Sequence, residues 1–555
     1  MPMRNTLFDH PIDPIRLEVF KHLFSSICEE MGAVLRKASF SPNIKERRDF
    51  SCAIFNANGS MIAQAAHIPV HLGSMPLSVA AVISKYNSKQ DSLCPGDTII
   101  LNNPYLGGTH LPDITLVTPV FISDSSTIVK SPFPKFPLDK FAGPFAYVAC
   151  RAHHADVGGI TPGSMPIARE IYQEGLIIPP IKLLSAGKLN NDIFDLILSN
   201  VRTPEERSGD LYAQIGANQR GLILLDDLFH RYNTIEVSHY MQELLNYTER
   251  MTRHLLSELP NGKYYFKDRL DNNGITESEV PIKVTITIDN DSALVDFTGS
   301  AAQQEGSINA VYAITLSAVN YVFRSLIGLD VPNNSGCLNP IKIIAPLGTV
   351  VNAVHPAPVA GGNVETSQRI VDVLLGALAQ ACPDRIPAAS QGTMNNVSIG
   401  GWDPEKGRYF TYYETIGGGT GASQNRDGFS AIQSHMTNTL NTPIEALEYT
   451  YPLRVTRYEI RRNSGGIGVH NGGDGINREI KLLTDAQVTL ITERRSTSPY
   501  GLDGGGPGKN GENKLIHGTE EVQLPGKGSF YVSNGDVLSI CTPGGGGFGS
   551  LDGRK

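Results

Sequence analysis

Residues 96–117 read GDTIILNNPYLGGTHLPDITLV, and residues 146–159 read AYVACRAHHADVGG. In the first stretch, an apolar run rich in β-branched residues stops at Asn-Asn-Pro and Gly-Gly and resumes after Asp113. This pattern predicts a strand, a tight loop and a second strand. The second stretch is an apolar strand that ends in polar residues and in two glycines, which permit close backbone approach. In both stretches, polar side chains therefore gather at the ends of predicted strands.

These strand ends carry imidazoles and carboxylates. Two imidazoles and one carboxylate, with positions left open, suit Zn(II), Mn(II) or Fe(II) used as a Lewis acid or as a source of hydroxide. We predict that His110, Asp113 and His153 bind one such divalent metal ion. His154 points away from His153 if the strand continues, so it is an extra ligand or a catalytic neighbour, and Asp156 is the expected orienting group. A His-x-x-Asp pair also occurs in hydrogen-bonded surface loops, and the pattern leaves that alternative open.

Four further polar residues are candidates of a second rank. We predict catalytic roles for Glu46 and Asp49, and substrate contacts for His67 and His71, which flank Ile-Pro-Val in an extended segment. The alternative is that the histidines are buried and hydrogen-bonded to backbone, as many structural histidines are.

A glycine run follows Tyr-Tyr-Glu-Thr in the second half. The backbone N–H groups of Gly417, Gly418 and Gly419 could stabilise an oxyanion or a phosphate, and we predict them as substrate-binding residues. The alternative is a turn that only lets two strands approach. The tract 503–508 has no phosphate-loop context, so we expect a loop with positive φ there.

Composition limits the function classes. The 555 residues, 40% of them hydrophobic, predict a large enzyme of roughly three or four domains. The formal net charge of -8, without a basic stripe, argues against nucleic-acid binding. Seven scattered cysteines without a Cys-x-x-Cys pair, and no apolar run of signal-peptide or membrane-spanning length, predict a cytoplasmic protein that does not contact a membrane.

Hydrophobic periodicity predicts the fold class. A helix is expected from Pro14 to Leu35 with Asp13 as its N-cap, and alternation over 280–288 and 292–298 predicts a hairpin. The fold class is α+β, with mixed and antiparallel sheets, a helix-rich middle and a glycine-rich β carboxy-terminal third. We divide the chain into an N-terminal α+β metal-site region (1–190), a helix-rich segment (191–260), an α+β middle region (261–400) and a mostly β region (401–555).

The segment 123–144 departs from this regularity. Its four prolines, mixed with aromatics and lysines, cannot form a regular central strand. We expect a surface loop, with a lid or a partner contact as the alternative.

Several longer motifs resemble the hydantoinase B/oxoprolinase family over nearly the whole chain. Besides the two metal segments, they are SPNIKERRDFSCA (41–53), AHIPVHLGSM (66–75), EIYQEGL (170–176), GGNVETSQR (361–369), ETIGGGTGA (414–422), HMTNT (435–439), YPLRV (451–455) and GGGGFG (544–549).

The resemblance implies one subunit of a two-component, ATP-dependent enzyme that opens small cyclic amides such as hydantoins, 5-oxoproline or lactams. In such systems a hydantoinase A-like partner uses ATP and Mg and phosphorylates the substrate, while the subunit similar to this chain carries the metal. The family's metal motifs fall on His110, Asp113 and His153. A hetero-oligomer is therefore expected.

Three alternatives remain open from the sequence. An ATP-dependent ketone carboxylase subunit would require bicarbonate and a ketone, although such relatives tend to be longer. A metallohydrolase that needs no partner would turn over alone. A non-catalytic scaffold would bind no metal.

Overall fold

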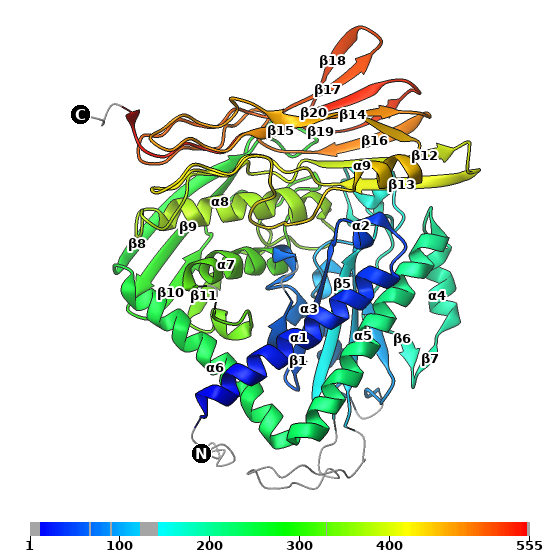
Figure 1. Ribbon diagram of the computed structural model, residues 1–555, viewed down its shortest axis with the longest axis vertical. Coiled ribbons are helices and arrows are strands. Elements are labelled where there is room, and N and C mark those ends of the chain that lie inside the picture. Colours follow the sequence, from blue (N-terminus) through cyan, green and yellow to red (C-terminus); the bar gives the residue numbers. More distant parts are fainter. Residues whose placement is uncertain (1–11, 66–67, 89–90, 123–142, 329, 552–555) are drawn as a thin grey trace.

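The computed structural model describes residues 12–65, 68–88, 91–122, 143–328 and 330–551. Within these residues the strands form sheets of seven, four, four and five strands. Figure 1 shows the first two sheets and their helices below, and the last third of the chain lying across the top. The expected α+β class with mixed and antiparallel sheets is confirmed.

The seven-stranded sheet is antiparallel throughout, in the order β2-β1-β5-β4-β3-β6-β7. Every residue of β4 and β5 is buried, which explains why these strands read as continuous apolar runs. The strands are β1 (Phe50–Asn56), β2 (Met61–Gln64), β3 (Thr98–Leu101), β4 (Asp113–Val120), β5 (Ala146–His153), β6 (Ile181–Ser185) and β7 (Lys188–Leu189).

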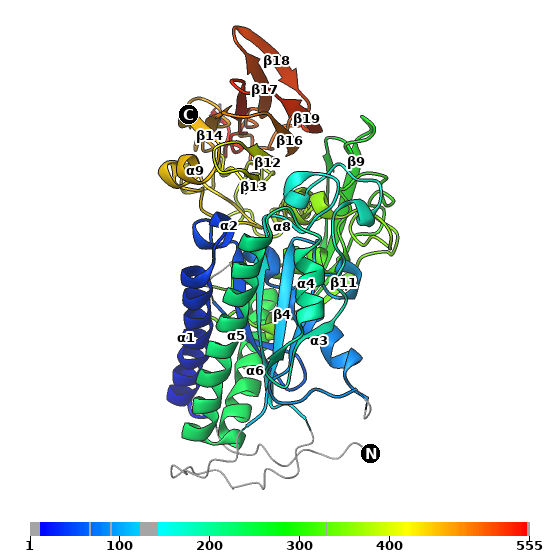
Figure 2. The same cartoon turned by 90° about the vertical axis from the view of Figure 1, so that its right-hand side faces the viewer.

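Helices cover both faces of this sheet. α1 (Pro14–Ala38) and α5 (Pro204–Tyr232) pack on one face with α6 (Thr234–Glu258) beside them, as Figure 2 shows, and α3 (Met75–Lys85) packs on the other. The predicted start of α1 is confirmed, because Asp13 Oδ1 accepts the N–H of Ile15 at 2.9 Å. Two short helices lie beside these elements: α2 (Pro42–Lys45) contacts α1 and β5, and α4 (Asn191–Leu198) contacts α5. None of the described helices is long and apolar enough to cross a membrane.

The middle sheet is mixed, in the order β11-β10-β9-β8, with β10 and β11 parallel. β9 and β10 form the predicted hairpin. All residues of α8 are buried between this sheet and its neighbours. The elements are β8 (Gly262–Leu270), β9 (Val280–Asp289), β10 (Ser292–Asp296), β11 (Ile341–Ile344), α7 (Tyr312–Ile327) and α8 (Ser367–Leu378).

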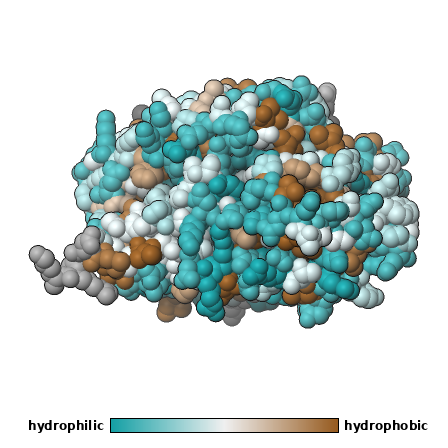
Figure 3. Space-filling view, turned by 90° about the horizontal axis from the view of Figure 1, so that it is seen from above, coloured by the Kyte–Doolittle hydropathy of each residue, from teal (hydrophilic) through white to brown (hydrophobic). Residues whose placement is uncertain are grey.

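The carboxy-terminal layer consists of two antiparallel sheets that share one core. Their orders are β13-β12-β16-β19 and β14-β15-β20-β17-β18. The outer face, seen in Figure 3, is mainly hydrophilic with small hydrophobic groups. The elements are β12 (Asn396–Asp403), β13 (Arg408–Glu414), α9 (Ile444–Thr450), β14 (Leu453–Arg461), β15 (Gly475–Leu482), β16 (Ala486–Ile491), β17 (Glu512–His517), β18 (Glu520–Leu524), β19 (Lys527–Val532) and β20 (Val537–Cys541).

Glycine segments pack side by side against these sheets. Gly545 donates its N–H to Gly473 O at 2.9 Å, and Gly473 donates to Thr420 O at 2.9 Å. A Cβ on Gly545 would lie 1.9 Å from Thr420 O. The expectation of positive φ in the tract 503–508 holds for Asp503 and Gly504 only. Most of these glycines are therefore required for close backbone contact rather than for unusual φ angles.

This packing predicts the effect of one methyl group. Gly545→Ala should lower the free energy of unfolding by about 1–3 kcal/mol, because neighbouring backbone must move to admit the Cβ. Gly216→Ala is the control, since its Cβ in α5 would meet only Val34 Cγ1 at 3.8 Å. Urea unfolding of both variants measures the difference. Equal midpoints for the two variants would contradict the packing argument.

Candidate metal centre

The antiparallel pairing of β4 with β5 brings the predicted ligands together. Asp113, the first residue of β4, pairs with His153, the last residue of β5. His110 precedes β4 in a turn closed by the hydrogen bond from Asp113 N–H to His110 O at 3.1 Å. One ligand atom from each residue lies within 4.8 Å of the others, and all three residues are buried.

The polar atoms of this cluster fit a cation. His110 Nδ1, Asp113 Oδ1 and His153 Nε2 are buried and lack a hydrogen-bond partner within the part of the chain that the structure describes. Asp113 Oδ1 lies 3.3 Å from His110 Nε2 in an ion-pair contact. Unpaired buried polar atoms are costly, and a divalent ion would satisfy several of them at once. The donor set of two imidazoles and one carboxylate suits Zn, Mn or Fe(II).

Electrostatics give these groups the protonation states that metal binding needs. Burial by itself raises the pKa of Asp113, but His110 and His71 outweigh it and hold that pKa well below its usual range. Burial lowers the pKa of His153 well below its usual range, and His110 lowers it further. At neutral pH the carboxylate is therefore ionised and the imidazole of His153 is neutral.

The second oxygen of Asp113 is held by neighbouring polar groups. Thr109 Oγ1 donates to Asp113 Oδ2, and His71 Nε2 lies 3.5 Å from the same oxygen. Ser51 Oγ lies 2.8 Å from His71 Nδ1. His71 belongs to the 3-10 turn η2 (Pro69–His71). The structure thus places His71 against a predicted ligand, where it orients the carboxylate.

Residues that carried no predicted role complete the surroundings. Asn363 Nδ2 lies 3.1 Å from His110 Nε2, and Asn43 Nδ2 lies 3.0 Å from His153 Nδ1. The ring of Tyr413 stacks on His153 at a centroid distance of 4.6 Å and an angle of 8°. Their motifs are visible in the sequence, but nothing local shows that they meet, because Asn363 is 253 residues from His110.

Asp49 lies beside the centre, and its backbone carbonyl accepts the N–H of His153 at 3.0 Å. Burial raises the pKa of Asp49 to about 7, although Arg47 opposes the shift. Asp49 is therefore poised to exchange a proton near neutral pH. Glu46 is partly exposed, and the described residues show no contact between it and the cluster.

His154 and Asp156 point elsewhere. His154 Nε2 lies 2.9 Å from Gln214 Oε1 on α5, and burial lowers its pKa to about 4. Asp156 Oδ1 accepts a hydrogen bond from Arg202 Nη1 at 2.8 Å. These contacts tie the segment after β5 to the helical layer. They give no geometric support to the ligand or catalytic role expected for His154, or to the orienting role expected for Asp156.

The glycine run offers no free oxyanion donors at Gly418 and Gly419. Gly418 donates its N–H to Ile432 O at 3.0 Å, and Gly419 donates to Pro543 O at 3.1 Å. A Cβ on Gly417 would lie 2.8 Å from the carbonyl carbon of Ile432. The geometry matches the alternative of close strand approach. His67 and positions 123–142 of the predicted loop lie outside the described residues.

A cavity of about 370 Å³ lies against the turn η2. Pro69, Gln433 and His435 are among its lining residues. Gln433 Nε2 donates to Thr415 Oγ1 at 3.2 Å, and Arg47 Nη2 donates to the same oxygen at 2.9 Å. The wall of this cavity is therefore connected to the residues around His153. Its volume suits a small molecule.

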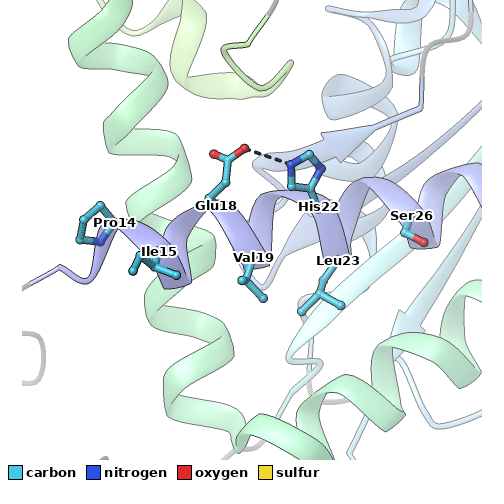
Figure 4. Close-up of a pocket in the computed structure, with 7 residues that line it drawn as sticks. All are labelled: Pro14, Ile15, Glu18, Val19, His22, Leu23 and Ser26. Atoms are coloured by element: carbon cyan, nitrogen blue, oxygen red, sulfur yellow. Dashed lines mark hydrogen bonds and ion pairs between the residues drawn. The ribbon is translucent and has the colours of Figure 1, made fainter.

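A second hollow lies on the exposed side of α1, away from this cluster. Figure 4 shows Ile15, Val19 and Leu23 on one side of α1, and Glu18 and His22 on the other. Glu18 Oε1 lies 3.0 Å from His22 Nε2. Its lining comes from a single helix and includes none of the cluster residues. It carries no sign of chemistry.

Glu174 holds the backbone that leads to Asn363. Its Oε1 accepts the N–H groups of Val359 at 2.8 Å and Ala360 at 2.9 Å. Burial raises the pKa of Glu174 to about 8, so the folded protein binds a proton that the unfolded chain releases above pH 4.5. Stability from this proton is complete at low pH and is lost as the pH rises towards 8.

Glu174→Gln should therefore be close to the wild type in stability near pH 5 and exceed it by about 4 kcal/mol at pH 9. The amide keeps the acceptor but cannot ionise. Denaturant unfolding at both pH values measures this difference, with the exposed Glu520→Gln as the control. A stability difference between Glu174→Gln and the wild type that does not change with pH would contradict the raised pKa of Glu174.

The chain is similar to several known proteins. The sequence model of the family described as hydantoinase B/oxoprolinase matches residues 13–551. The chain is 43% identical to the uncharacterized protein MJ0963 of Methanocaldococcus jannaschii, covering 97% of this chain and 91% of that one. It is 40% identical to 5-oxoprolinase 1 of Arabidopsis thaliana over 98% of this chain, but spans only 42% of that protein's length.

Two solved structures share the fold. The ATP-dependent caprolactamase from Pseudomonas jessenii matches with a TM-score of 0.87 and 28% identity, covering 98% of this chain and 92% of that one. An acetone carboxylase in a nucleotide-free structure matches with a TM-score of 0.88 and 18% identity, covering 98% and 77%. The second likeness concerns the fold alone.

Proposed function

Because the chain belongs to the hydantoinase B/oxoprolinase family, we propose that it is the metal-carrying subunit of an ATP-dependent hydrolase of cyclic amides. The observation that carries the proposal is the buried set of His110, Asp113 and His153, in which one polar atom of each residue lacks a hydrogen-bond partner among the described residues. The substrate is a small ring such as a hydantoin, 5-oxoproline or a lactam. The cavity of about 370 Å³ beside η2 has room for such a ring, although its lining residues do not include His110, Asp113 or His153.

The chemistry explains why ATP is needed. An amide carbonyl is a poor electrophile, because the nitrogen lone pair is delocalised into it. Transfer of a phosphoryl group from ATP to the carbonyl oxygen gives ADP and an imidate phosphate. Water adds to the carbon of this imidate, and the ring C–N bond then breaks as the nitrogen leaves as the protonated amine. A second water hydrolyses the resulting acyl phosphate to the carboxylate and free phosphate. The sequence has no Gly-x-x-x-x-Gly-Lys-Ser/Thr loop. We assign ATP and Mg to a hydantoinase A-like partner in a hetero-oligomer.

Residues of this chain have separate proposed roles in metal binding, in positioning of the carboxylate and in proton transfer. A divalent metal held by His110, Asp113 and His153 would supply Lewis-acid chemistry. His71 and Thr109 keep the Asp113 carboxylate in place. The Asp49 carboxylate is the proposed acceptor of the proton from the attacking water. None of the seven cysteines, all of which lie in the described residues, forms a disulfide bond, and this is compatible with the proposed cytoplasmic location.

Reconstitution tests the proposal. The chain, a hydantoinase A-like subunit, or both are incubated with ATP and with 5-oxoproline, hydantoin or ε-caprolactam. Only the mixture should release ADP and ring-opened product in equal amounts. Turnover by this chain alone would refute partner dependence. Fixation of labelled bicarbonate into acetone, without amide hydrolysis, would show a carboxylase instead.

A further inference from the structure

One turn of the middle region reaches both histidines of the metal centre. The π-helical turn η8 (Gly362–Thr366) places Asn363 beside His110. The turn is held tightly, because Gly362 donates its N–H to Ser307 O at 3.0 Å and a Cβ on Gly362 would lie 1.8 Å from Asn309 O. Single π-helical turns are rare and often lie at functional sites.

Glu365, in the same turn, is connected to the other histidine through a chain of side chains. Its Oε1 accepts a hydrogen bond from Asn396 Nδ2 at 2.6 Å and another from Met394 N–H at 3.1 Å. Asn396 Oδ1 accepts the hydroxyl proton of Tyr413 at 2.7 Å. The ring of Tyr413 stacks on His153. The path therefore runs from Glu365 through Asn396 and Tyr413 to the imidazole.

The direction of these hydrogen bonds is determined by a backbone group. Asn396 Nδ2 also donates to Ile491 O at 2.8 Å, and a carbonyl can only accept. The amide of Asn396 therefore cannot be reversed, and the Tyr413 hydroxyl must donate to Oδ1. Glu365, Asn396 and Tyr413 are each at most 2% exposed, so water does not compete for these bonds. A fully buried network of this kind holds one geometry.

We propose that Glu365 is a positioning residue for the metal centre: through Asn396 it anchors Tyr413, and the Tyr413 ring sets the plane of His153. Asn363 of the same turn contacts the other histidine, His110, at Nε2. The inference rests on the proposed function, because it concerns the ions that His110, Asp113 and His153 would hold. Groups that orient metal-binding histidines typically change metal affinity about 10- to 100-fold when removed.

Binding of Co²⁺ alone tests the proposal, because its visible absorption reports the geometry around the ion. Tyr413→Phe keeps the ring but loses the anchor, and Glu365→Ala removes the acceptor. Both should weaken Co²⁺ binding by about 10-fold or more and shift the visible bands. Glu365→Gln keeps an acceptor oxygen and should therefore have the Co²⁺ affinity and the visible spectrum of the wild type. Tyr409→Phe is the control, since Tyr409 is on the same strand but is 57% exposed.

The outcomes distinguish a failure of the positioning role from a failure of the proposed metal centre. If the wild type binds Co²⁺ and Tyr413→Phe binds it with unchanged affinity and spectrum, the positioning role is wrong while the metal centre stands. If the folded wild type binds no Co²⁺, the proposed metal centre itself fails. Near-UV circular dichroism checks the folding of each variant. Should Glu365→Ala not fold, Tyr413→Phe and Glu365→Gln decide the question.

Discussion

Alanine at His110, Asp113 or His153 should abolish near-stoichiometric metal binding, with affinity for Zn²⁺ or Mn²⁺ falling by at least about 100-fold. Each substitution removes one of three ligands from a buried site, whereas loss of a group that only orients a ligand already costs about 10- to 100-fold. Asp113→Asn should have nearly the same effect, because the neutral amide no longer balances the charge of the cation.

Elemental analysis of dialysed protein measures this result. His154→Ala is the matched control, because His154 is adjacent and equally buried but contacts Gln214. It should keep its metal. A folded wild type without metal, or an alanine variant at any of the three ligand positions that retains it, would show that these residues do not form the centre.

Removing Glu414 should lower the free energy of unfolding of the carboxy-terminal layer by about 3–5 kcal/mol. Glu414 Oε2 lies 2.8 Å from Arg478 Nε, and both side chains are 0% exposed. Glu414→Ala would leave a guanidinium buried without its counter-ion, and would also remove one of the two acceptors of Asn441 Nδ2. The cost comes mainly from the unpaired charge rather than from loss of the pair itself.

Two further variants test this explanation. Glu414→Leu combined with Arg478→Met removes both charges and should recover most of the stability. Glu459→Ala breaks an exposed pair with Arg457 and should leave stability nearly unchanged. Guanidinium titrations followed by near-UV circular dichroism provide the comparison. A double variant as unstable as Glu414→Ala would mean that packing, and not charge, dominates at this position.

The elements of the fold that could be predicted are those whose signals are local. Asp13 and Pro14 mark the start of α1, and alternation marks the hairpin of β9 and β10. The glycine tracts were harder to interpret. Glycine indicates either positive φ or close approach, and only the neighbours show which applies; at Gly545 it is the carbonyl of Thr420.

The candidate site likewise has residues that the sequence could predict and contacts that only the structure shows. His110, Asp113 and His153 could be found because strand ends and tight loops are visible in sequence, and the antiparallel pairing of β4 with β5 then brings them together. The N–H groups of Gly418 and Gly419, which were expected to bind substrate, instead donate to the backbone carbonyls of Ile432 and Pro543. Both acceptors are distant in sequence, so only the tertiary structure could show this.

The sequence by itself determined the family, the main helices and strands, and the residues predicted to bind metal, because periodicity, capping and motifs act over short distances along the chain. Only the tertiary structure decided what surrounds those residues. Asn43, Asn363 and Tyr413 come from three separate parts of the chain, and side-chain contacts between such parts depend on how whole layers pack. The same packing turned His154 towards α5, since successive side chains at a strand end face opposite sides of the sheet.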